Sequence, residues 1–260
     1  MLNRKVTAVY FSATGTNRTS VCAIASGLSK QYRELDLTGF DAGSQEITFG
    51  KDDILVIGAP VYSGRIYKGA ARRFTCLKGD HTPCVVTVTY GNRHYDDALL
   101  ELFDQMKSQG FCPVAAAALI GEHTFGEIQV GRPNSRDQDE DKNFALNVAA
   151  KLETEGADLE RMTDFVLPGS RPYMDGGSGG GFRPLTSAAC TLCGLCVKAC
   201  PEQAIAQDCK TIDSEKCISC FRCIRSCPQK AKNMETPDYN GFAVEFSARL
   251  AKARPNEYFM

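Results

Sequence analysis

The chain has 260 residues, of which 43% are hydrophobic and 23% charged, and its formal net charge is −1. This balance is typical of a globular protein with one large domain or two smaller ones, and it gives no electrostatic reason to expect nucleic acid or a membrane surface as a partner. The longest apolar run, Pro113–Gly121, is too short to span a bilayer, and residues 1–5 lead into a strand-like run without a signal peptide. We therefore expect a soluble, cytoplasmic protein.

The first 165 residues alternate between strand-like and helix-like segments. Four short apolar runs have the composition of buried parallel strands: Lys5–Phe11, Asp53–Pro60, Thr82–Tyr90 and Cys112–Gly121. A weaker strand is predicted over Arg33–Leu37. Helices are predicted over Asn17–Lys30 and along the apolar faces of Ala98–Met106 and Phe144–Leu152. This alternation predicts an α/β domain with a doubly wound parallel sheet in the flavodoxin-like order 2-1-3-4-5. Its ligand is expected at the carboxyl ends of strands one, three and four.

The loop after the first strand has the composition of a phosphate-binding turn. Its residues are Ser12, Ala13, Thr14, Gly15, Thr16 and Asn17. Small residues with hydroxyl and amide side chains let backbone N–H groups surround a phosphate at a helix N-terminus. The loop lacks the lysine of a nucleotide P-loop, so it favours flavin mononucleotide (FMN) over a triphosphate. The alternative is an ordinary helix cap rich in Ser and Thr.

Two further loops, Ala59–Ile66 and Tyr90–Tyr95, follow the third and fourth strands. With them the domain resembles flavodoxin, in which aromatic side chains from two loops sandwich the isoalloxazine ring of FMN. The resemblance implies stacking by Tyr62 and Tyr95 and a backbone flip of the Ser63–Gly64 peptide toward the reduced ring. Asn92 stands where flavodoxins usually carry Asp, and both tyrosines have an alternative as surface residues. The implied FMN-binding residues of these loops are Pro60, Val61, Tyr62, Ser63, Gly64, Tyr90, Gly91, Asn92 and Tyr95.

A change of composition near residue 166 predicts a domain boundary. Leu167–Tyr173 and Gly176–Gly181 are rich in Pro and Gly, which is typical of a flexible linker. We therefore divide the chain into an FMN-binding domain (1–165), a linker (166–186), a small α+β cluster domain (187–235) and a helical tail (236–260). The tail helix is predicted from Phe242, Val244, Phe246 and Leu250 and has no assigned function.

The cluster domain contains two copies of the run C-x₂-C-x₂-C-x₃-C-P. The first is Cys190, Cys193, Cys196 and Cys200-Pro201, and the second is Cys217, Cys220, Cys223 and Cys227-Pro228. This is the run of bacterial ferredoxins, whose fourth cysteine ligates the cluster of the other run. It predicts two [4Fe–4S] clusters, one held by Cys190, Cys193, Cys196 and Cys227 and the other by Cys217, Cys220, Cys223 and Cys200. Zinc is the main alternative, and disulfides would need an oxidising compartment.

Other features of the sequence bear on partners. The cluster domain carries seven basic residues (Lys198, Lys210, Lys216, Arg222, Arg225, Lys230, Lys232) against four acidic ones (Glu202, Asp208, Asp213, Glu215). Such charge favours an acidic redox partner, or else offsets the charge of the clusters. The loop His123–Asp141, flanked by Glu122, is interpreted as a solvated insertion, with a lid or docking surface as the alternative. The scattered cysteines Cys22, Cys76, Cys84, Cys112 and Cys209 are expected to be buried apolar residues.

The blocks Pro60–Gly64, Gly91–Arg93 and Pro168–Gly169, placed ahead of the cysteine runs, resemble the flavodoxin–ferredoxin fusion proteins of anaerobic bacteria over residues 1–235. This resemblance implies a protein that relays electrons between FMN, two clusters and an external redox protein, with a homodimer as a possible state. One alternative is an FMN-dependent oxidoreductase that reduces a quinone or nitro compound. The other is a redox-sensing or maturation-assisting binding module. No catalytic residue is identified.

Overall fold

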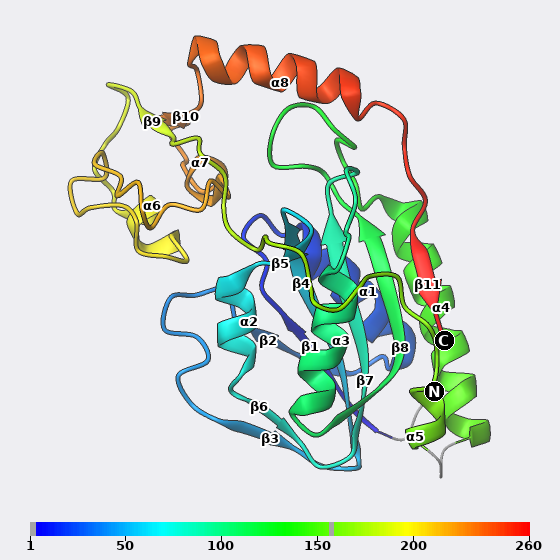
Figure 1. Ribbon diagram of the computed structural model, residues 1–260. Coiled ribbons are helices and arrows are strands. Elements are labelled where there is room, and N and C mark those ends of the chain that lie inside the picture. The colour runs from blue at the N-terminus through cyan, green and yellow to red at the C-terminus, as the bar shows by residue number, and fades with distance from the viewer. Residues whose placement is uncertain (1–3, 156–158) are drawn as a thin grey trace.

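The computed structural model describes residues 4–155 and 159–260, and a parallel sheet lies at its centre (Figure 1). Its parallel strands are β1 (Lys5–Tyr10), β2 (Tyr32–Asp36), β4 (Asp53–Tyr62), β7 (Thr82–Tyr90) and β8 (Phe111–Ile120). They lie in the order β8-β7-β4-β1-β2, so the predicted flavodoxin-like order is confirmed. Short strands at the margins are β3 (Ile47–Phe49), which pairs with β6 (Leu77–Gly79), and β5 (Arg65–Ile66), which pairs with β4.

Helices cover both faces of the sheet because successive side chains of the central strands, which point to opposite faces, are apolar. Val6, Ala8 and Val56 pack against α1 (Thr16–Leu28) and α4 (Ser135–Glu155), with the short α5 (Leu159–Met162) beside them. Val9, Leu55 and Val86 point to the other face, which α2 (Lys68–Phe74) and α3 (Ala98–Ser108) cover. β8 is buried along its whole length, as a strand covered on both faces must be. None of the described helices is long and apolar enough to cross a membrane.

The cysteine-rich module lies beside the carboxyl ends of the strands (Figure 1). Its two helices, α6 (Leu195–Ala199) and α7 (Arg222–Arg225), each follow a residue in the left-handed region, Gly194 and Phe221. A two-stranded ribbon of β9 (Leu185–Thr186) and β10 (Lys232–Asn233) closes the module. The module is attached to α2 by Arg73, whose buried guanidinium contacts Glu202 at 3.0 Å and the backbone oxygen of Pro201.

The segment 166–186 differs from the flexible tether expected from its composition. Asp97, at the start of α3, accepts from the backbone N–H groups of Ser170 at 2.9 Å and Met174 at 2.7 Å. Gly177 donates to the oxygen of Tyr62 at 2.8 Å, and its own oxygen accepts from Lys68 at 2.9 Å. The glycines allow this close approach to β4 and β5, so the segment is an ordered connection along the domain.

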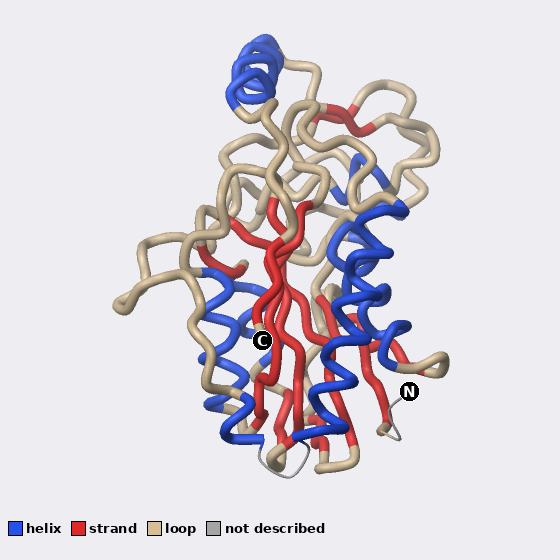
Figure 2. Tube along the Cα trace, turned by 90° about the vertical axis from the view of Figure 1, so that its right-hand side faces the viewer, coloured by secondary structure: helices blue, strands red, loops and turns tan. Residues whose placement is uncertain are grey.

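The C-terminal segment returns to the first domain. The predicted tail helix is α8 (Pro237–Arg249), which begins with Thr236 as its N-cap and lies across the top of the strand ends, as Figures 1 and 2 show. Beyond it, β11 (Glu257–Phe259) pairs antiparallel with β8 and extends the sheet. The sequence did not predict this strand. The chain therefore passes from the first domain to the cysteine-rich module and back again.

Candidate functional site

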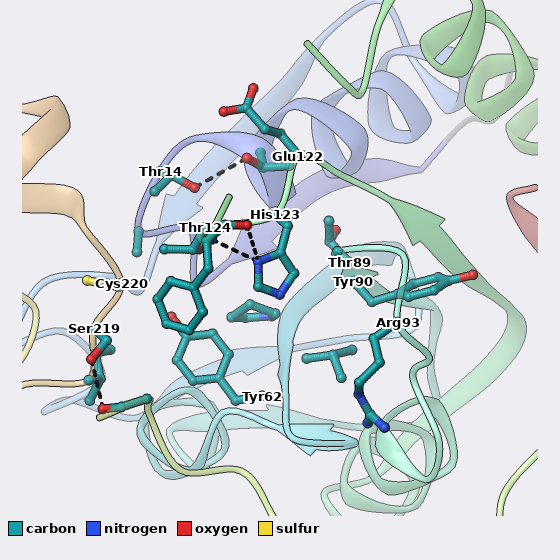
Figure 3. Close-up of a pocket in the computed structure, with 18 of the residues that line it drawn as sticks. Thr14, Tyr62, Thr89, Tyr90, Arg93, Glu122, His123, Thr124, Ser219 and Cys220 are labelled. Atoms are coloured by element: carbon teal, nitrogen blue, oxygen red, sulfur yellow. Dashed lines mark hydrogen bonds between the residues drawn. The ribbon is translucent and has the colours of Figure 1, made fainter. Parts of the chain in front are cut away.

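A cavity of about 270 Å³ opens at the carboxyl ends of the parallel strands (Figure 3). This volume lies near the lower end of small-molecule sites, which span roughly 300–1,000 Å³. Its walls come from the three loops selected in the sequence, from the loop after β8, from α8 and from the second cysteine run. We refer to it as the main cavity. It lies where ligands bind in open α/β sheets, at the reversal of strand order.

The loop after β1 leaves a row of backbone donors at the start of α1. Ser12, Ala13, Thr14, Thr16 and Asn17 line the main cavity. The backbone N–H groups of residues 13–17 have no hydrogen-bond partner within the described chain. Asn17 is buried and holds the loop in place, because its side chain donates to the oxygen of Phe11 at 3.0 Å and accepts from Thr89 at 2.8 Å. Free N–H groups at a helix N-terminus fit a phosphate.

The loop after β4 brings Pro60, Val61, Tyr62 and Ser63 to the main cavity. Ser63 and Gly64 form a two-residue turn with positive φ angles of 51° and 83°, which suits the twist of the β4–β5 hairpin. Gly64 itself lies outside the cavity lining. Burial first, and then the nearby Cys220 thiol, raise the pKa of Tyr62 well above its ordinary value. Tyr62 therefore presents a neutral ring between the cavity and the cysteine-rich module.

The loop after β7 meets the expectation only in part. Tyr90 and Gly91 line the main cavity, whereas Asn92 and Tyr95 do not. Tyr95 is 1% exposed, and its hydroxyl donates to Glu257 at 2.9 Å. Its stacking role in the main cavity is thus not supported by this geometry, because the ring is enclosed in the core beneath the C-terminal segment. Asn92 donates to the oxygens of Leu250 at 2.7 Å and Lys252 at 2.9 Å, so it too holds that segment.

Aromatic residues that the sequence reasoning missed form the remaining wall. His123 and Phe125 come from the loop after β8, and Phe242 and Phe246 from α8. Phe242 and Phe246 stack at 5.1 Å, as residues four apart on a helix can. The interpretation of 123–141 as a solvated insertion is therefore wrong for its first residues, and the segment from Ser135 onward belongs to α4. The spacing of Phe242 and Phe246 indicated an apolar helix face but not what it covers.

The second cysteine run contacts the main cavity directly. Ile218, Ser219 and Cys220 form part of its wall. Next to them, Nη1 of Arg222 donates to the backbone oxygen of Ser12 at 3.1 Å, and Arg225 forms an ion pair with Glu122. These two arginines therefore join the module to the first domain.

The eight predicted cluster ligands line two separate cavities in the two predicted sets. The inner cavity is lined by Cys200, Cys217, Cys220 and Cys223. The outer cavity is lined by Cys190, Cys193, Cys196 and Cys227, and also by Cys209. Among the described residues no three His, Cys, Asp or Glu side chains converge as they do around a single metal ion. The four cysteines of each set instead line one cavity, and their thiolates are the donors that an iron–sulfur cluster takes.

The inner and outer cavities differ in their surroundings. Burial raises the pKa of the Cys220 and Cys223 thiols to about 12, so these groups must lose protons when they bind iron. Cys220 lines both the inner and the main cavity. By contrast, Cys193 of the outer set is exposed, and the side chains of Leu192 and Leu195 beside it are 58% and 47% exposed.

Comparison with known proteins separates the two parts of the chain. A family model described as a 4Fe-4S dicluster domain matches residues 189–231, which contain both cysteine runs. No curated protein sequence matches the chain.

Solved structures similar to the first part include flavodoxins. One from the domain Archaea is 15% identical over 57% of this chain and 99% of its own, with a TM-score of 0.37. Flavodoxin 2 from Bacillus cereus is 13% identical over 56% of this chain and 99% of its own, with a TM-score of 0.40. The rubredoxin oxygen:oxidoreductase from Desulfovibrio gigas is 14% identical over 59% of this chain, with a TM-score of 0.44, and only 37% of that larger protein is covered. The strand order of the sheet and the family match show an α/β domain with a flavodoxin-like sheet, followed by a 4Fe-4S dicluster domain.

Proposed function

We propose that this chain is an electron-transfer protein that binds FMN in the main cavity and two [4Fe–4S] clusters in the inner and outer cavities. The observation that carries the proposal is the position of Cys220, which lines both the main and the inner cavity. A flavin in one cavity and a cluster in the other would be separated by little more than this side chain. Such a wall supports electron transfer within the chain.

The residues of the main cavity suit FMN by their chemistry. The free N–H groups of residues 13–17 and the hydroxyls of Thr14 and Thr16 would hold the phosphate. Tyr62 and Phe125 offer aromatic surface for the ring. When bound, FMN supplies an exchange between two-electron and one-electron chemistry, which one-electron clusters lack. Because the aromatic residues of α8 cover the cavity, the chain itself limits access of water to the ring.

The two cluster sites take different positions in the proposed relay. The inner site faces the flavin through Cys220, whereas no cysteine of the outer set lines the main cavity. Cys193 of the outer set is exposed to solvent. We therefore assign the inner cluster to exchange with the flavin and the outer cluster to exchange with an external protein.

The surface around the outer site favours a particular kind of partner. Leu192 and Leu195 give it an exposed apolar centre, and Lys198 and Lys230 are basic residues of the same module. The basic charge available for docking is smaller than the sequence suggested, because Arg222, Arg225 and Lys232 form contacts within the chain. A small one-electron carrier with an acidic rim would complement this surface.

The proposal is tested by anaerobic reconstitution followed by iron, sulfide and flavin analysis with EPR spectroscopy. We expect about eight irons and one FMN per chain, since each predicted ligand set holds a four-iron cluster. Cys220→Ala and Cys193→Ala form a matched pair that removes one ligand from the inner or the outer set. Each is expected to lose the signal of a different cluster. Loss of both signals in both variants would contradict the proposal. Tightly bound zinc in place of iron would also contradict it.

A second candidate function is supported by the apolar roof of the main cavity. Phe125, Phe242 and Phe246 provide stacking surface that a small aromatic acceptor could share with the flavin. An FMN-dependent reductase would then turn over a quinone or nitroarene with a reduced electron-carrier protein as donor. Steady anaerobic turnover that depends on Phe242 and Phe246 would support this function over a pure carrier.

A further inference from the structure

His123 is held rigidly at the wall of the main cavity. Its ring lies against Phe246 at 5.0 Å and Phe125 at 5.5 Å between centroids. The backbone of Gly91 packs directly against the ring, since a Cβ at that glycine would lie 2.1 Å from Cδ2 of His123. The backbone N–H of His123 donates to the oxygen of Ile128 at 3.0 Å, which closes the loop. The imidazole is thus fixed by packing on several sides.

The hydrogen bonds of the ring determine its tautomer. The backbone N–H of Phe125 donates to Nδ1 of His123 at 2.8 Å, so Nδ1 presents a lone pair. The backbone oxygen of Phe125 also lies 3.1 Å from Nδ1, and we assign the shorter contact, from the amide N–H at 2.8 Å, as the hydrogen bond. A neutral imidazole carries its proton on the other nitrogen. Nε2–H is therefore a donor, and Figure 3 shows that this side of the ring points into the cavity.

The surroundings keep the ring neutral. Burial is the largest cause that lowers the pKa of His123 to about 4; the charge of Arg93 adds to this shift, and the backbone oxygen of Phe125 near Nδ1 opposes it. Glu122, the nearest acid along the chain, also lines the cavity but is paired with Arg225 and accepts from the N–H of Gly131. The guanidinium of Arg249 lies over the ring of Phe246, 5.1 Å from its centroid, and adds further positive charge beside His123. The group facing the cavity is consequently a neutral donor at physiological pH.

We propose that His123 is a fixed, neutral hydrogen-bond donor to the isoalloxazine ring, and that it stabilises the reduced ring relative to the oxidised one. The inference rests on the proposed FMN site and names a residue that sets its redox balance. Reduction places more electron density on the nitrogens and oxygens of the ring, so a donor that cannot move gains more from the reduced form. Because the donor does not titrate near neutral pH, its effect is independent of pH in that range.

The test compares the affinities of oxidised and reduced FMN in three variants of the holoprotein. In His123→Phe the donor is lost while aromatic packing against Phe125 and Phe246 remains. In His123→Gln the side-chain oxygen can accept from Phe125 and the amide can donate into the cavity. His81 is exposed and does not line the cavity, and His81→Phe controls for general effects of losing a histidine.

We expect His123→Phe to weaken binding of reduced FMN about tenfold relative to oxidised FMN, the worth of a typical hydrogen bond. For a two-electron couple, this ratio means that the midpoint potential of bound FMN is about 30 mV lower in His123→Phe than in the wild type. His123→Gln should recover most of the difference, and His81→Phe should show none. Nitrogen NMR of the imidazole should report the Nε2–H tautomer, with no titration between about pH 5 and 8.

Two results would overturn the inference. The first is an unchanged ratio of affinities in His123→Phe with FMN still bound, which leaves the proposed function standing. The second is a His123 ring that titrates near neutral pH. Failure of the wild-type protein to bind FMN at all would remove the proposed function and this inference together, and it is distinguishable because flavin content is measured first.

Discussion

Nη1 of Arg222 donates to the backbone oxygen of Ser12 at 3.1 Å. This bond joins the helix inside the second cysteine run to the loop that we assign to the FMN phosphate. The first domain and the cysteine-rich module are therefore in contact at the place where both cofactors are proposed. Removal of Arg222 should therefore loosen the boundary without touching any cysteine ligand.

We predict that Arg222→Ala increases hydrogen exchange at residues 12–18 and 218–226. A hydrogen bond to a charged group contributes roughly 1.5–3 kcal/mol, so local opening should become at least about tenfold more frequent. Lys198→Ala, in the same module but with no hydrogen bond or ion pair to the first domain among the described residues, is the matched control. Equal exchange in both variants would show that Arg222 does not hold the boundary.

The contrast between Tyr62 and Tyr95 gives a second prediction. Tyr62→Ala should weaken FMN binding by about tenfold or more, since base–aromatic and ring–aromatic stacking is worth roughly 1–3 kcal/mol. Tyr95→Phe removes only the hydroxyl that binds Glu257. It should leave FMN affinity nearly unchanged and instead make residues 250–260 more sensitive to protease. Flavin fluorescence titration and limited proteolysis measure the two effects, and unchanged FMN affinity in Tyr62→Ala would contradict the stacking role of Tyr62.

Gly91 gives a third prediction because of its contact with His123. A methyl group at position 91 would force the His123 ring away from its place, where the Cβ position lies 2.1 Å from Cδ2. Gly91→Ala should reproduce the loss of reduced-FMN affinity of His123→Phe and also lower the melting temperature. The control is Gly241→Ala, at an open position within α8, which should be neutral or slightly stabilising. Normal flavin affinities in Gly91→Ala would show that the ring can relocate without cost.

Asp141 gives a prediction on pH. Its carboxyl is fully buried and accepts from Tyr258 at 2.9 Å, and burial together with the charges of Asp137 and Glu140 raises its pKa to about 7. In the unfolded chain the pKa of Asp141 should lie near the ordinary value of about 3.9. The folded protein therefore binds the proton more tightly, and the free energy of unfolding falls as pH rises from about 4 to 7.

Asp141→Asn should remove this fall. The difference in unfolding free energy between variant and wild type should grow by roughly 2–4 kcal/mol over that pH range, since each unit of pKa difference is worth about 1.4 kcal/mol. Denaturant titrations at several pH values measure it. A difference that stays constant with pH would mean that Asp141 ionises freely in the folded protein.

The sequence predicted the strand order because strand-like and helix-like segments alternate, and it predicted which cysteines line a common cavity because the spacing of the two runs indicates it. The cysteine runs fix which sulfurs can share a cavity, and Cys220 and Cys193 fall in the sets that spacing assigned. The aromatic wall depends on contacts across the chain and was missed. Phe246 lines the main cavity from α8, and the chain then returns to β8 through β11, a pairing of three residues without a periodic signal. Tyr95 was misplaced for the same reason, since its partner Glu257 lies 162 residues away.

We propose that the flavin and the inner cluster exchange electrons within one chain through the wall at Cys220. Anaerobic rapid mixing tests it most directly. The clusters are reduced by a brief pulse of reductant and the absorbance of bound FMN is followed at several protein concentrations. Exchange within one chain should reduce the flavin at a rate that does not depend on protein concentration. Flavin that stays oxidised beside reduced clusters, or a rate proportional to protein concentration, would contradict it.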